Sequence, residues 1–419
     1  MRDMTDPDAF LRALFAAAVA RADPMVCVPA HLPPKPAGHV VVLGAGKASA
    51  SMAEAVEAVW GPCEGYVITR YGYSRPCQGI KIVEASHPVP DLAGLDATRH
   101  LLGVANGLGA DDTVIMLISG GGSALLCAPA DGLTLADKQA LSSQMLASGM
   151  PIGDINGIRK ELSAVKGGRL AAAVYPAKLV ALLISDVPGD DPSDIASGPT
   201  VGHAGSAVQA IETLTKWNVE PPAAIAAYLA DGGDPLAADD PRLATVENVI
   251  IAAPSQSLAA AAKMAEAQGV EVRMLGDALE GEARDLAAAQ AEMAIGIATQ
   301  KLDHPVLLLS GGECTVTRTG NGVGGPNAEF TLAAAIALRG HPKIHCIACD
   351  TDGVDGVAEV AGAIANPSTL ALSEAIGISA AEALHNNDAH GFFGAIGAQV
   401  VTGPTMTNVN DFRAILVMP

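Results

Sequence analysis

The sequence predicts an α/β protein made of two α/β/α domains, the first Rossmann-like with a mainly parallel sheet. Continuous apolar runs, such as residues 40–43 and 114–118, each lead into a glycine-rich turn and then into a helical pattern. Such runs are typical of strands that helices cover on both faces. Only 3% of the 419 residues are aromatic, so Ala, Val, Leu and Ile must build the cores, and the length exceeds one ordinary core.

The charge balance argues against nucleic acid or an anionic membrane as a partner. Lys and Arg number 25 against 45 Asp and Glu, a formal net charge of −20. No apolar run approaches the ~20 residues of a membrane span, and the acidic N-terminus does not indicate a targeting peptide. The seven cysteines are an odd, scattered set that fits a reducing compartment, so we expect a cytoplasmic protein. Cys346 and Cys349 match CxxC but should point to opposite faces of one strand.

Strands and helices are predicted to alternate along the first half. Asp6 and Pro7 form an N-cap and first-turn pair that begins a helix. A proline-rich connector at 29–36 then precedes the first strand. We expect strands at residues 40–43, 65–69, 81–85, 114–118 and 178–184, and helices ending near 60 and spanning 92–108 and 136–148.

The first strand ends in a turn that is close to GxGxxG, with Gly44, Gly46 and Lys47 inside it. Dinucleotide sites and plain strand–helix turns share this pattern. A dinucleotide site also needs an acidic residue about 20 positions later, where this chain has Thr69 and Arg70. A cation at Lys47 opposes the helix macrodipole, which favours contact with an anion over a merely solvated lysine.

A second turn, after residues 114–118, contains three consecutive glycines, which cost backbone entropy and add no packing. They are useful where backbone N–H groups must approach an anion; a tight turn without ligand is the alternative. A similar turn after residues 306–309 strengthens the case for a site. The two turns read Ser119-Gly120-Gly121-Gly122-Ser123 and Ser310-Gly311-Gly312-Glu313.

Basic residues are concentrated in residues 159–169. Arg159 and Lys166 lie seven positions apart, so they share a helix face and are expected to serve an anion, as is Arg169. Lys160 is more typical of a solvated face.

Carboxylates follow two of the predicted strands. Asp186 and Asp190 come after residues 178–184, at the edge where α/β sheets bind ligands, and could hold a metal or act as a base. Turn capping is the alternative. Asp350, Asp352 and Asp355 follow residues 344–349 in a spacing that suggests a Mg²⁺ or nucleotide contact rather than a calcium loop. His87, in a proline-rich loop, is a weaker acid–base candidate.

The domain boundary is predicted where residues 202–242 become rich in Ala, Asp, Gly and Pro, giving domains 1–235 and 242–419. The second domain should have strands at 248–252, 270–275, 306–309, 344–349 and 414–417, with helices at 257–268 and 280–299.

Nearly the whole chain resembles the class II glycerate 2-kinases, whose C-terminal part is a MOFRL domain. In the first domain the resemblance rests on Val42-Leu43-Gly44-Ala45-Gly46-Lys47-Ala48, Ser86-His87-Pro88, the turn 119–124, the basic segment 158–168 and Ser185-Asp186-Val187-x-Gly189-Asp190. In the second it rests on Ser310-Gly311-Gly312-Glu313-x-Thr315-Val316, Gly324-Gly325-x-Asn327-x-Glu329, Asp350-Thr351-Asp352-Gly353-x-Asp355-Gly356 and Thr402-Gly403-Pro404-Thr405-x-Thr407-Asn408-Val409.

The resemblance implies ATP- and Mg²⁺-dependent phosphorylation of D-glycerate at its 2-hydroxyl, in a cleft between the two domains. It implies that Lys47 contacts phosphate or substrate, that residues 120–123 cradle an anion, and that Glu313, Asn327, Asp350 and Asp355 line the facing wall. Some relatives have Arg at the position of Pro326, so Arg159 or Arg318 substitutes for it or its role is less general.

We therefore expect a kinase outside the P-loop class, because the chain has no GxxxxGK[ST] motif. Lys47, Asp186 and Arg159 are the predicted catalytic residues: Lys47 neutralises charge, Asp186 is base or metal ligand, and Arg159 with Lys166 holds a carboxylate or phosphate. Asp190, Asp352 and Asp355 are the predicted metal ligands. The alternatives are an NAD(P)H-dependent hydroxypyruvate reductase and a non-catalytic sugar-acid sensor. A homodimer is compatible with the sequence, which fixes neither oligomeric state nor nucleotide preference.

Overall fold

The computed structural model describes residues 6–234 and 236–419, which form two compact units. We call Pro24–Ser185 with Asp190–Ile251 the N-terminal unit, and the described residues up to Asp23, Asp186–Gly189 and Ala252–Pro419 the C-terminal unit. This division differs from the predicted domains 1–235 and 242–419, whose residues 1–5 and 235 lie outside the description. The first helix belongs with the C-terminal unit, and the strand around residue 250 belongs to the first sheet.

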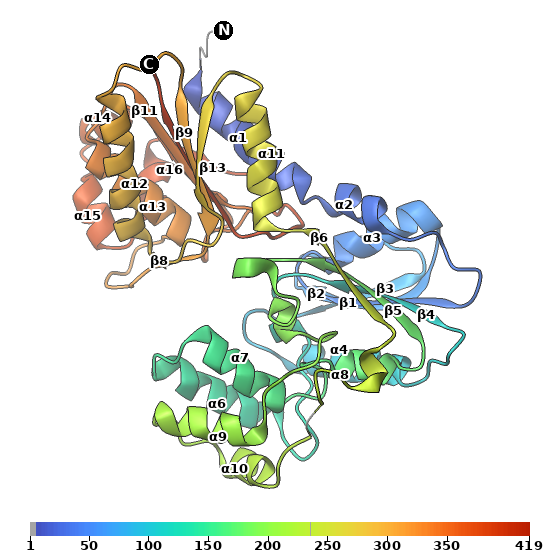
Figure 1. Ribbon diagram of the computed structural model, residues 1–419. Helices are drawn as coiled ribbons and strands as arrows, with labels where there is room; N and C mark the ends of the chain where they lie inside the picture. Colours follow the sequence, from blue (N-terminus) through green and yellow to red (C-terminus); the bar gives the residue numbers. More distant parts are fainter. Residues whose placement is uncertain (1–5, 235) are drawn as a thin grey trace. The chain divides into compact units, whose positions relative to one another are not determined.

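The N-terminal unit is built on a six-stranded sheet in the order β3-β2-β1-β4-β5-β6 (Figure 1). Strands β1 to β5 pair in parallel, which confirms the Rossmann-like prediction. The chain adds strands on one side of β1 up to β3 and then on the other side from β4 onward, so the strand order reverses between β1 and β4. Open α/β sheets bind ligands at such a point. The strands are β1 Val40–Ala45, β2 Glu64–Arg70, β3 Ile80–Ala85, β4 Thr113–Ile118, β5 Lys178–Ile184 and β6 Val246–Ala252.

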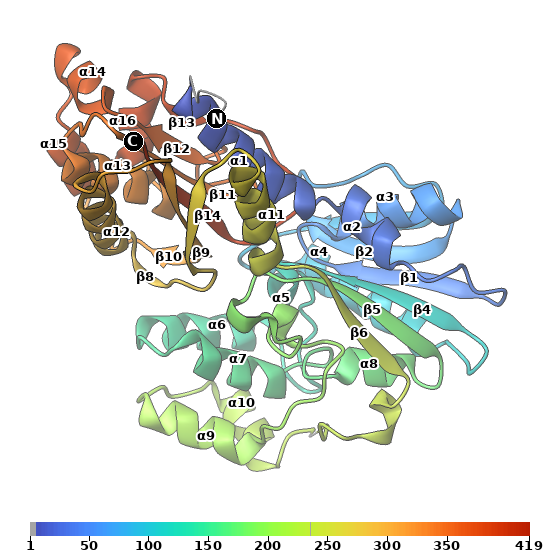
Figure 2. The same ribbon diagram turned by 45° about the horizontal axis from the view of Figure 1, so that its top comes forward.

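Four helices of this unit form a group with its own apolar core, separate from the helices on the sheet (Figure 2). Their buried residues include Leu141, Ile158, Leu214 and Ile225. This group consists of α6 Leu135–Ala147, α7 Ile152–Glu161, α9 Ala207–Lys216 and α10 Ala223–Ala230. The other helices are α2 Pro24–His31, α3 Ser49–Trp60, α4 Leu92–Ala105, α5 Gly122–Leu125 and α8 Arg169–Val174, with short 3₁₀ turns η1 Pro188–Asp190, η2 Ile195–Ser197 and η3 Pro241–Leu243.

The C-terminal unit has a mixed six-stranded sheet in the order β13-β12-β11-β14-β9-β7. Only the β7–β9 pair is parallel among its pairings. The strands are β7 Glu271–Gly276, β9 Val306–Gly312, β11 Ile344–Asp350, β12 Gly362–Ala365, β13 Gln399–Val400 and β14 Asp411–Val417, and a separate small ladder joins β8 Gly281–Glu282 to β10 Cys314–Thr315.

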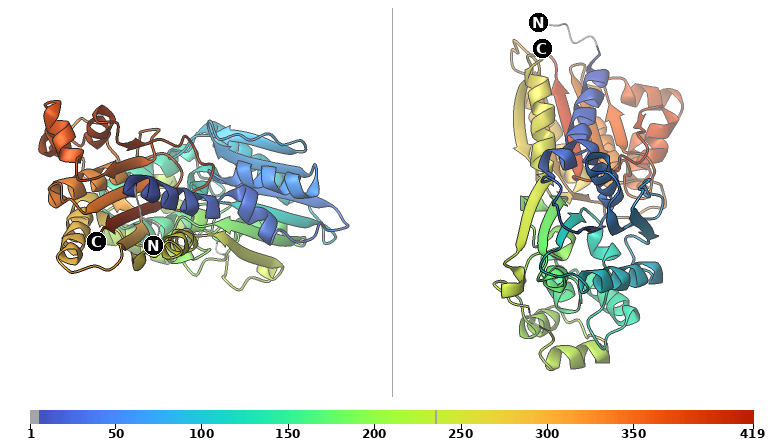
Figure 3. Two further views of the ribbon diagram at one scale, coloured as in Figure 1. Left: turned by 90° about the horizontal axis from the view of Figure 1, so that it is seen from above. Right: turned by 90° about the vertical axis from the view of Figure 1, so that its right-hand side faces the viewer.

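Helices cover both faces of this sheet, so the unit is an α/β/α sandwich as predicted. The helices α1 Pro7–Arg21 and α11 Pro254–Glu266 lie side by side on one face (Figure 3). The opposite face packs against α12 Ala283–Ala298 and α13 Pro326–Leu338. The shorter α14 Thr369–Ala375, α15 Ala380–His385 and α16 Ala389–Ala395 complete the unit.

Cys346 and Cys349 on β11 belong to the apolar cores on opposite sides of the sheet, which confirms the predicted divergence of the CxxC thiols. All seven cysteines are free. Within the described residues Pro7–His31 is long and apolar enough to cross a membrane, a candidate that the sequence analysis did not anticipate. It divides into α1 and α2, and α1 buries Phe10, Leu11, Leu14 and Phe15 in the C-terminal unit's core.

Candidate functional site

The turns that follow β1 and β4 are joined to each other at the switch point of the first sheet. The backbone N–H of Lys47 donates to the carbonyl of Gly120 (2.8 Å), and the N–H of Ala48 donates to Ser119 Oγ (3.0 Å). The hydroxyls of Ser49 and Ser119 lie 3.2 Å apart. The two turns that the sequence analysis singled out separately therefore form one structure.

Close packing explains the glycines of the first turn. A Cβ on Gly44 would lie 2.4 Å from the carbonyl oxygen of Leu117. Gly46 has a φ of +147°, and its Cβ would lie 2.1 Å from Ser119 Oγ. Ser119 is fully buried and its hydroxyl binds the start of α3. Gly44, Gly46 and Ser119 thus join β1 and β4, and substrate or phosphate binding by these three residues stays a prediction.

The first turn also has its backbone donors occupied. The N–H groups of Gly46, Lys47, Ala48 and Ser49 donate to Ile68 O, Gly120 O, Ser119 Oγ and Gly46 O. A dinucleotide pyrophosphate needs such donors at the helix start. Arg70, at the end of β2, stacks over the ring of Tyr73 at 5.2 Å. These contacts weigh against the reductase alternative.

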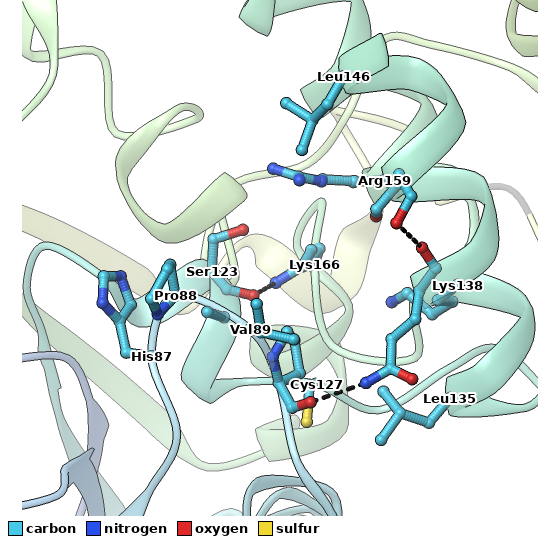
Figure 4. A pocket seen from close by; sticks show the side chains of 16 residues that line it. His87, Pro88, Val89, Ser123, Cys127, Leu135, Lys138, Leu146, Arg159 and Lys166 are labelled. Carbon is cyan, nitrogen blue, oxygen red and sulfur yellow. Dashed lines mark hydrogen bonds between the residues drawn. The ribbon is translucent and has the colours of Figure 1, made fainter. Parts of the chain in front are cut away.

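A cavity of about 610 Å³ opens beside the second turn (Figure 4). It lies between α6, α7 and the loops that follow β3 and β4. One stripe of α6 faces it, because its contributions recur at spacings of three or four residues. The lining residues are His87, Pro88, Val89, Pro90, Gly121, Ser123, Ala124, Cys127, Leu135, Lys138, Gln139, Ser142, Ser143, Leu146, Arg159 and Lys166.

Three cations, Lys138, Arg159 and Lys166, line this pocket, and none of its lining residues is acidic. The Lys166 side chain is 2% exposed, and its Nζ donates to the carbonyls of Ser123 (2.7 Å) and Leu126 (3.0 Å), so its partners are neutral. Burial, with the nearby Arg159 charge, lowers the pKa of Lys138 from 10.5 to about 8.

Burial also lowers the pKa of Arg159, and burial with the charges of Lys138 and Arg159 lowers the pKa of Lys166 well below its usual value. Uncompensated positive charge costs free energy unless an anion binds there. The arrangement is therefore suited to an anionic ligand.

The second turn contributes Gly121 and Ser123 to the pocket. Gly121 has a φ of +76°, and a Cβ there would lie 3.0 Å from the His87 ring and 3.2 Å from Lys47 Cγ. Lys47 and His87 thus flank Gly121. Ser123 Oγ lies 2.8 Å from Ser197 Oγ. Gly122 packs on η2, where its Cβ would lie 2.7 Å from Ala196 Cβ.

In the C-terminal unit, Asp355 and Asn327 serve the start of α13. Asp355 Oδ1 accepts from the N–H of Asn327 (3.0 Å), and Oδ2 accepts from the N–H of Ala328 (2.8 Å). His390 Nε2 lies 2.9 Å from Oδ2 of the same carboxylate. Asp355 is fully buried. Its oxygens thus accept hydrogen bonds at the start of α13, and metal binding by Asp355 stays a prediction. Pro326 occupies the first turn of α13, where proline is favoured.

A buried network continues from Asn327, whose Nδ2 donates to Asp411 Oδ1 (2.7 Å). Asp411 pairs with Arg413 (2.8 Å), and burial raises the pKa of Asp411 to about 6. The Ser310–Glu313 segment is not a strand-to-helix turn, because β9 runs through both glycines. A Cβ on Gly312 would lie 2.3 Å from Leu279 N.

Among the other predicted acidic residues, Asp350, Asp352 and Asp186 accept hydrogen bonds. Asp350 Oδ1 accepts from Asp352 N and Asp352 Oδ1 from Val354 N, both at 2.8 Å, as in turn capping. Asp186 Oδ2 accepts from Asn408 Nδ2 (3.2 Å). Glu313 is exposed, and Asp190 lies in η1. Over the described residues, no group of three or more His, Cys, Asp or Glu side chains could hold a metal ion.

Lys138 is the main pocket residue that the sequence analysis missed. A capping box of Thr134 and Asp137 begins α6 and places Lys138 in its first turns. Gln139 Nε2 donates to the carbonyl of Pro90 (2.9 Å), which ties α6 to the loop after β3. The available signal was the mixed stripe at positions 135, 138, 139, 142 and 146, beside the buried Leu141 and Met145.

Two family descriptions match the chain. A domain of unknown function, DUF4147, covers residues 10–230, and the MOFRL family covers residues 306–411. The D-glycerate 2-kinase of Thermotoga maritima is 37% identical over 385 residues, which is 91% of each chain. The chain belongs to the MOFRL-containing glycerate 2-kinase family.

Other members of the glycerate 2-kinase family are similar throughout. The crystal structure of glycerate kinase from T. maritima has a TM-score of 0.88 and 35% identity, covering 98% of this chain and 99% of that one. A relative from Agrobacterium vitis, provisionally named a hydroxypyruvate reductase, is 48% identical over 415 residues, 97% of this chain and 94% of its own. The kinase and reductase names therefore occur within one family.

Proposed function

We propose that the chain is a glycerate 2-kinase, which transfers the γ-phosphoryl group of ATP to the 2-hydroxyl of D-glycerate and yields 2-phospho-D-glycerate and ADP. The observation that carries the proposal is the pocket with three cations and no acidic lining residue, in the unit whose sheet has the Rossmann strand order. Such a pocket suits the anions of phosphoryl transfer, where catalysis consists mainly of positioning and charge stabilisation.

The residues have distinct roles in this proposal. Arg159 and Lys166 hold an anionic group, and Lys47, beside Gly121, neutralises charge that develops on the transferred phosphoryl group. The 2-hydroxyl oxygen attacks the γ-phosphorus, the bond from that phosphorus to the bridging oxygen breaks, and ADP leaves. Asp186 takes the hydroxyl proton as general base.

Magnesium enters this proposal as a companion of ATP. Asp190, Asp352 and Asp355 stay the predicted metal ligands; both oxygens of Asp355 accept N–H bonds, and among the described residues no group of three or more His, Cys, Asp or Glu side chains could hold a metal ion. Mg²⁺ is commonly bound through substrate phosphates with one or two carboxylates.

The reductase is the second candidate, and the name of the A. vitis relative is what favours it. It would use the Gly44–Ser49 turn for the cofactor pyrophosphate, yet the N–H groups of that turn donate within the protein. A coupled assay with D-glycerate, ATP and Mg²⁺, run beside one with hydroxypyruvate and NADH or NADPH, separates the two. NADH consumption without glycerate phosphorylation would overturn the kinase proposal, and no turnover in either assay would favour a sensor. We also propose a cytoplasmic location.

A further inference from the structure

The pocket in Figure 4 holds more basic side chains than one carboxylate can pair with. Lys138, Arg159 and Lys166 line it, and none of its lining residues is acidic. Glycerate carries a single carboxylate, so it would leave two of these basic groups without an anionic partner from the ligand. A triphosphate carries several negative charges and matches the whole group.

The pocket is also too large for glycerate. Its volume is about 610 Å³, and cavities of ~300–1,000 Å³ enclose drug-sized ligands. Glycerate has only three carbons and four oxygens, whereas a nucleoside triphosphate is of the size that such cavities enclose.

Apolar walls lie next to the cations. Val89 is 61% exposed and Leu146 is 62% exposed, and both line the pocket. Pro88 and Leu135 extend these walls, and Ser142 and Gln139 on α6 add polar groups. A cationic floor with apolar walls suits a ligand that has phosphates at one end and a flat base at the other.

We infer that this pocket holds the nucleoside triphosphate, with its phosphates on Lys138, Arg159 and Lys166 and its base against Val89 and Leu146, and that glycerate binds outside it. The inference rests on the proposed function and assigns one of its two substrates. Lys138 becomes a nucleotide-binding residue of the reaction. The lowered pKa of Lys138, caused by burial and the neighbouring Arg159, agrees with this role, because bound phosphates would restore its charged form.

The test uses the full chain and two pocket variants, Lys138→Gln and Leu146→Ser. Calorimetry measures the Kd for ATP without glycerate, and steady-state kinetics give KM for ATP and for D-glycerate separately. We expect Lys138→Gln to raise the Kd and KM for ATP about 10- to 100-fold, and Leu146→Ser to raise them several-fold. KM for glycerate should stay within twofold of the wild-type value.

Matched controls are Lys263→Gln on the exposed face of α11 and Leu372→Ser on α14, where Leu372 is 49% exposed. Both should leave each constant unchanged. Lys138→Arg, which keeps the charge, should retain most of the ATP affinity and so separates charge from folding.

Two results would overturn the inference while leaving the proposed function intact. In the first, Lys138→Gln raises KM for glycerate and leaves the Kd for ATP unchanged. In the second, both pocket variants phosphorylate glycerate with wild-type constants. A third result would contradict the proposed function and uphold the nucleotide pocket. In it, the wild-type chain binds ATP, Lys138→Gln weakens that binding, and the wild-type chain does not phosphorylate glycerate.

Discussion

Removing the charge of Lys138 should stabilise the protein in the absence of nucleotide. Burial and Arg159 lower the pKa of this lysine from 10.5 to about 8. At ~1.4 kcal/mol per pKa unit, that drop corresponds to about 3 kcal/mol of destabilisation when the lysine is charged in the folded state. Lys138→Met removes the charge and keeps an apolar stem of similar length. We expect it to raise the free energy of unfolding at pH 7 by up to about 3 kcal/mol.

The pH dependence gives the sign of this effect. The folded-state pKa lies below the unfolded one, so the charged lysine destabilises the fold fully below about pH 8. Between pH 8 and 10.5 the folded protein releases the proton while the unfolded chain still holds it, so the cost fades as pH rises. The advantage of Lys138→Met should therefore fall below about 1 kcal/mol at pH 10.

Urea unfolding followed by tryptophan fluorescence measures this directly. The chain has two tryptophans, Trp60 and Trp217, and both lie in the N-terminal unit with Lys138. Lys263→Met on the exposed face of α11 is the matched control and should change the unfolding free energy little. The reasoning is refuted if Lys138→Met gains no stability at pH 7, or if it gains the same amount at pH 10.

Three further predictions concern single residues. Lys47→Ala should lower kcat for glycerate phosphorylation by at least ~100-fold with an unchanged urea midpoint, and activity within a few-fold of wild type would contradict its role. Gly46→Ala should lower the free energy of unfolding in urea by about 3 kcal/mol or more, because its Cβ would lie 2.1 Å from Ser119 Oγ. The control Gly103→Ala, whose Cβ would meet nothing within 4 Å, should not lower it. Asp355→Ala should cost about 3 kcal/mol by circular dichroism, because it leaves the start of α13 uncapped; a fully stable variant with a raised Mg²⁺ requirement would instead indicate a metal ligand.

The strands were predictable from the sequence because uninterrupted apolar runs need no knowledge of their neighbours. The division between the units was not, because it depends on contacts that are distant in sequence. Strand β6 joins the first sheet, where Leu179 N donates to Thr245 O just before it. The first helix joins the C-terminal unit, where the ring centroids of Phe15 and Phe412 lie 5.7 Å apart. Neither contact leaves a local signal in the sequence.

The candidate site was predictable in part, because some of its features are local in the sequence. Glycine-rich turns after strands indicated where a site could form, and Arg159 and Lys166 do line the pocket with Gly121 and Ser123. Sequence could not tell which glycines face a ligand and which allow close packing, since that depends on how near β1 lies to β4. It also could not show that Asp355 caps the start of α13, which is 28 positions earlier in the chain.

Phosphorus NMR of the reaction products tests the central claim most directly. The purified chain is mixed with ATP, Mg²⁺ and D-glycerate, and the phosphoester signals are followed with time. The kinase account predicts that ADP and 2-phosphoglycerate form in equal amounts. When glycerate is omitted, the ATP signals should stay unchanged. An unchanged ATP spectrum, together with hydroxypyruvate-dependent oxidation of NADH by the same preparation, would contradict it.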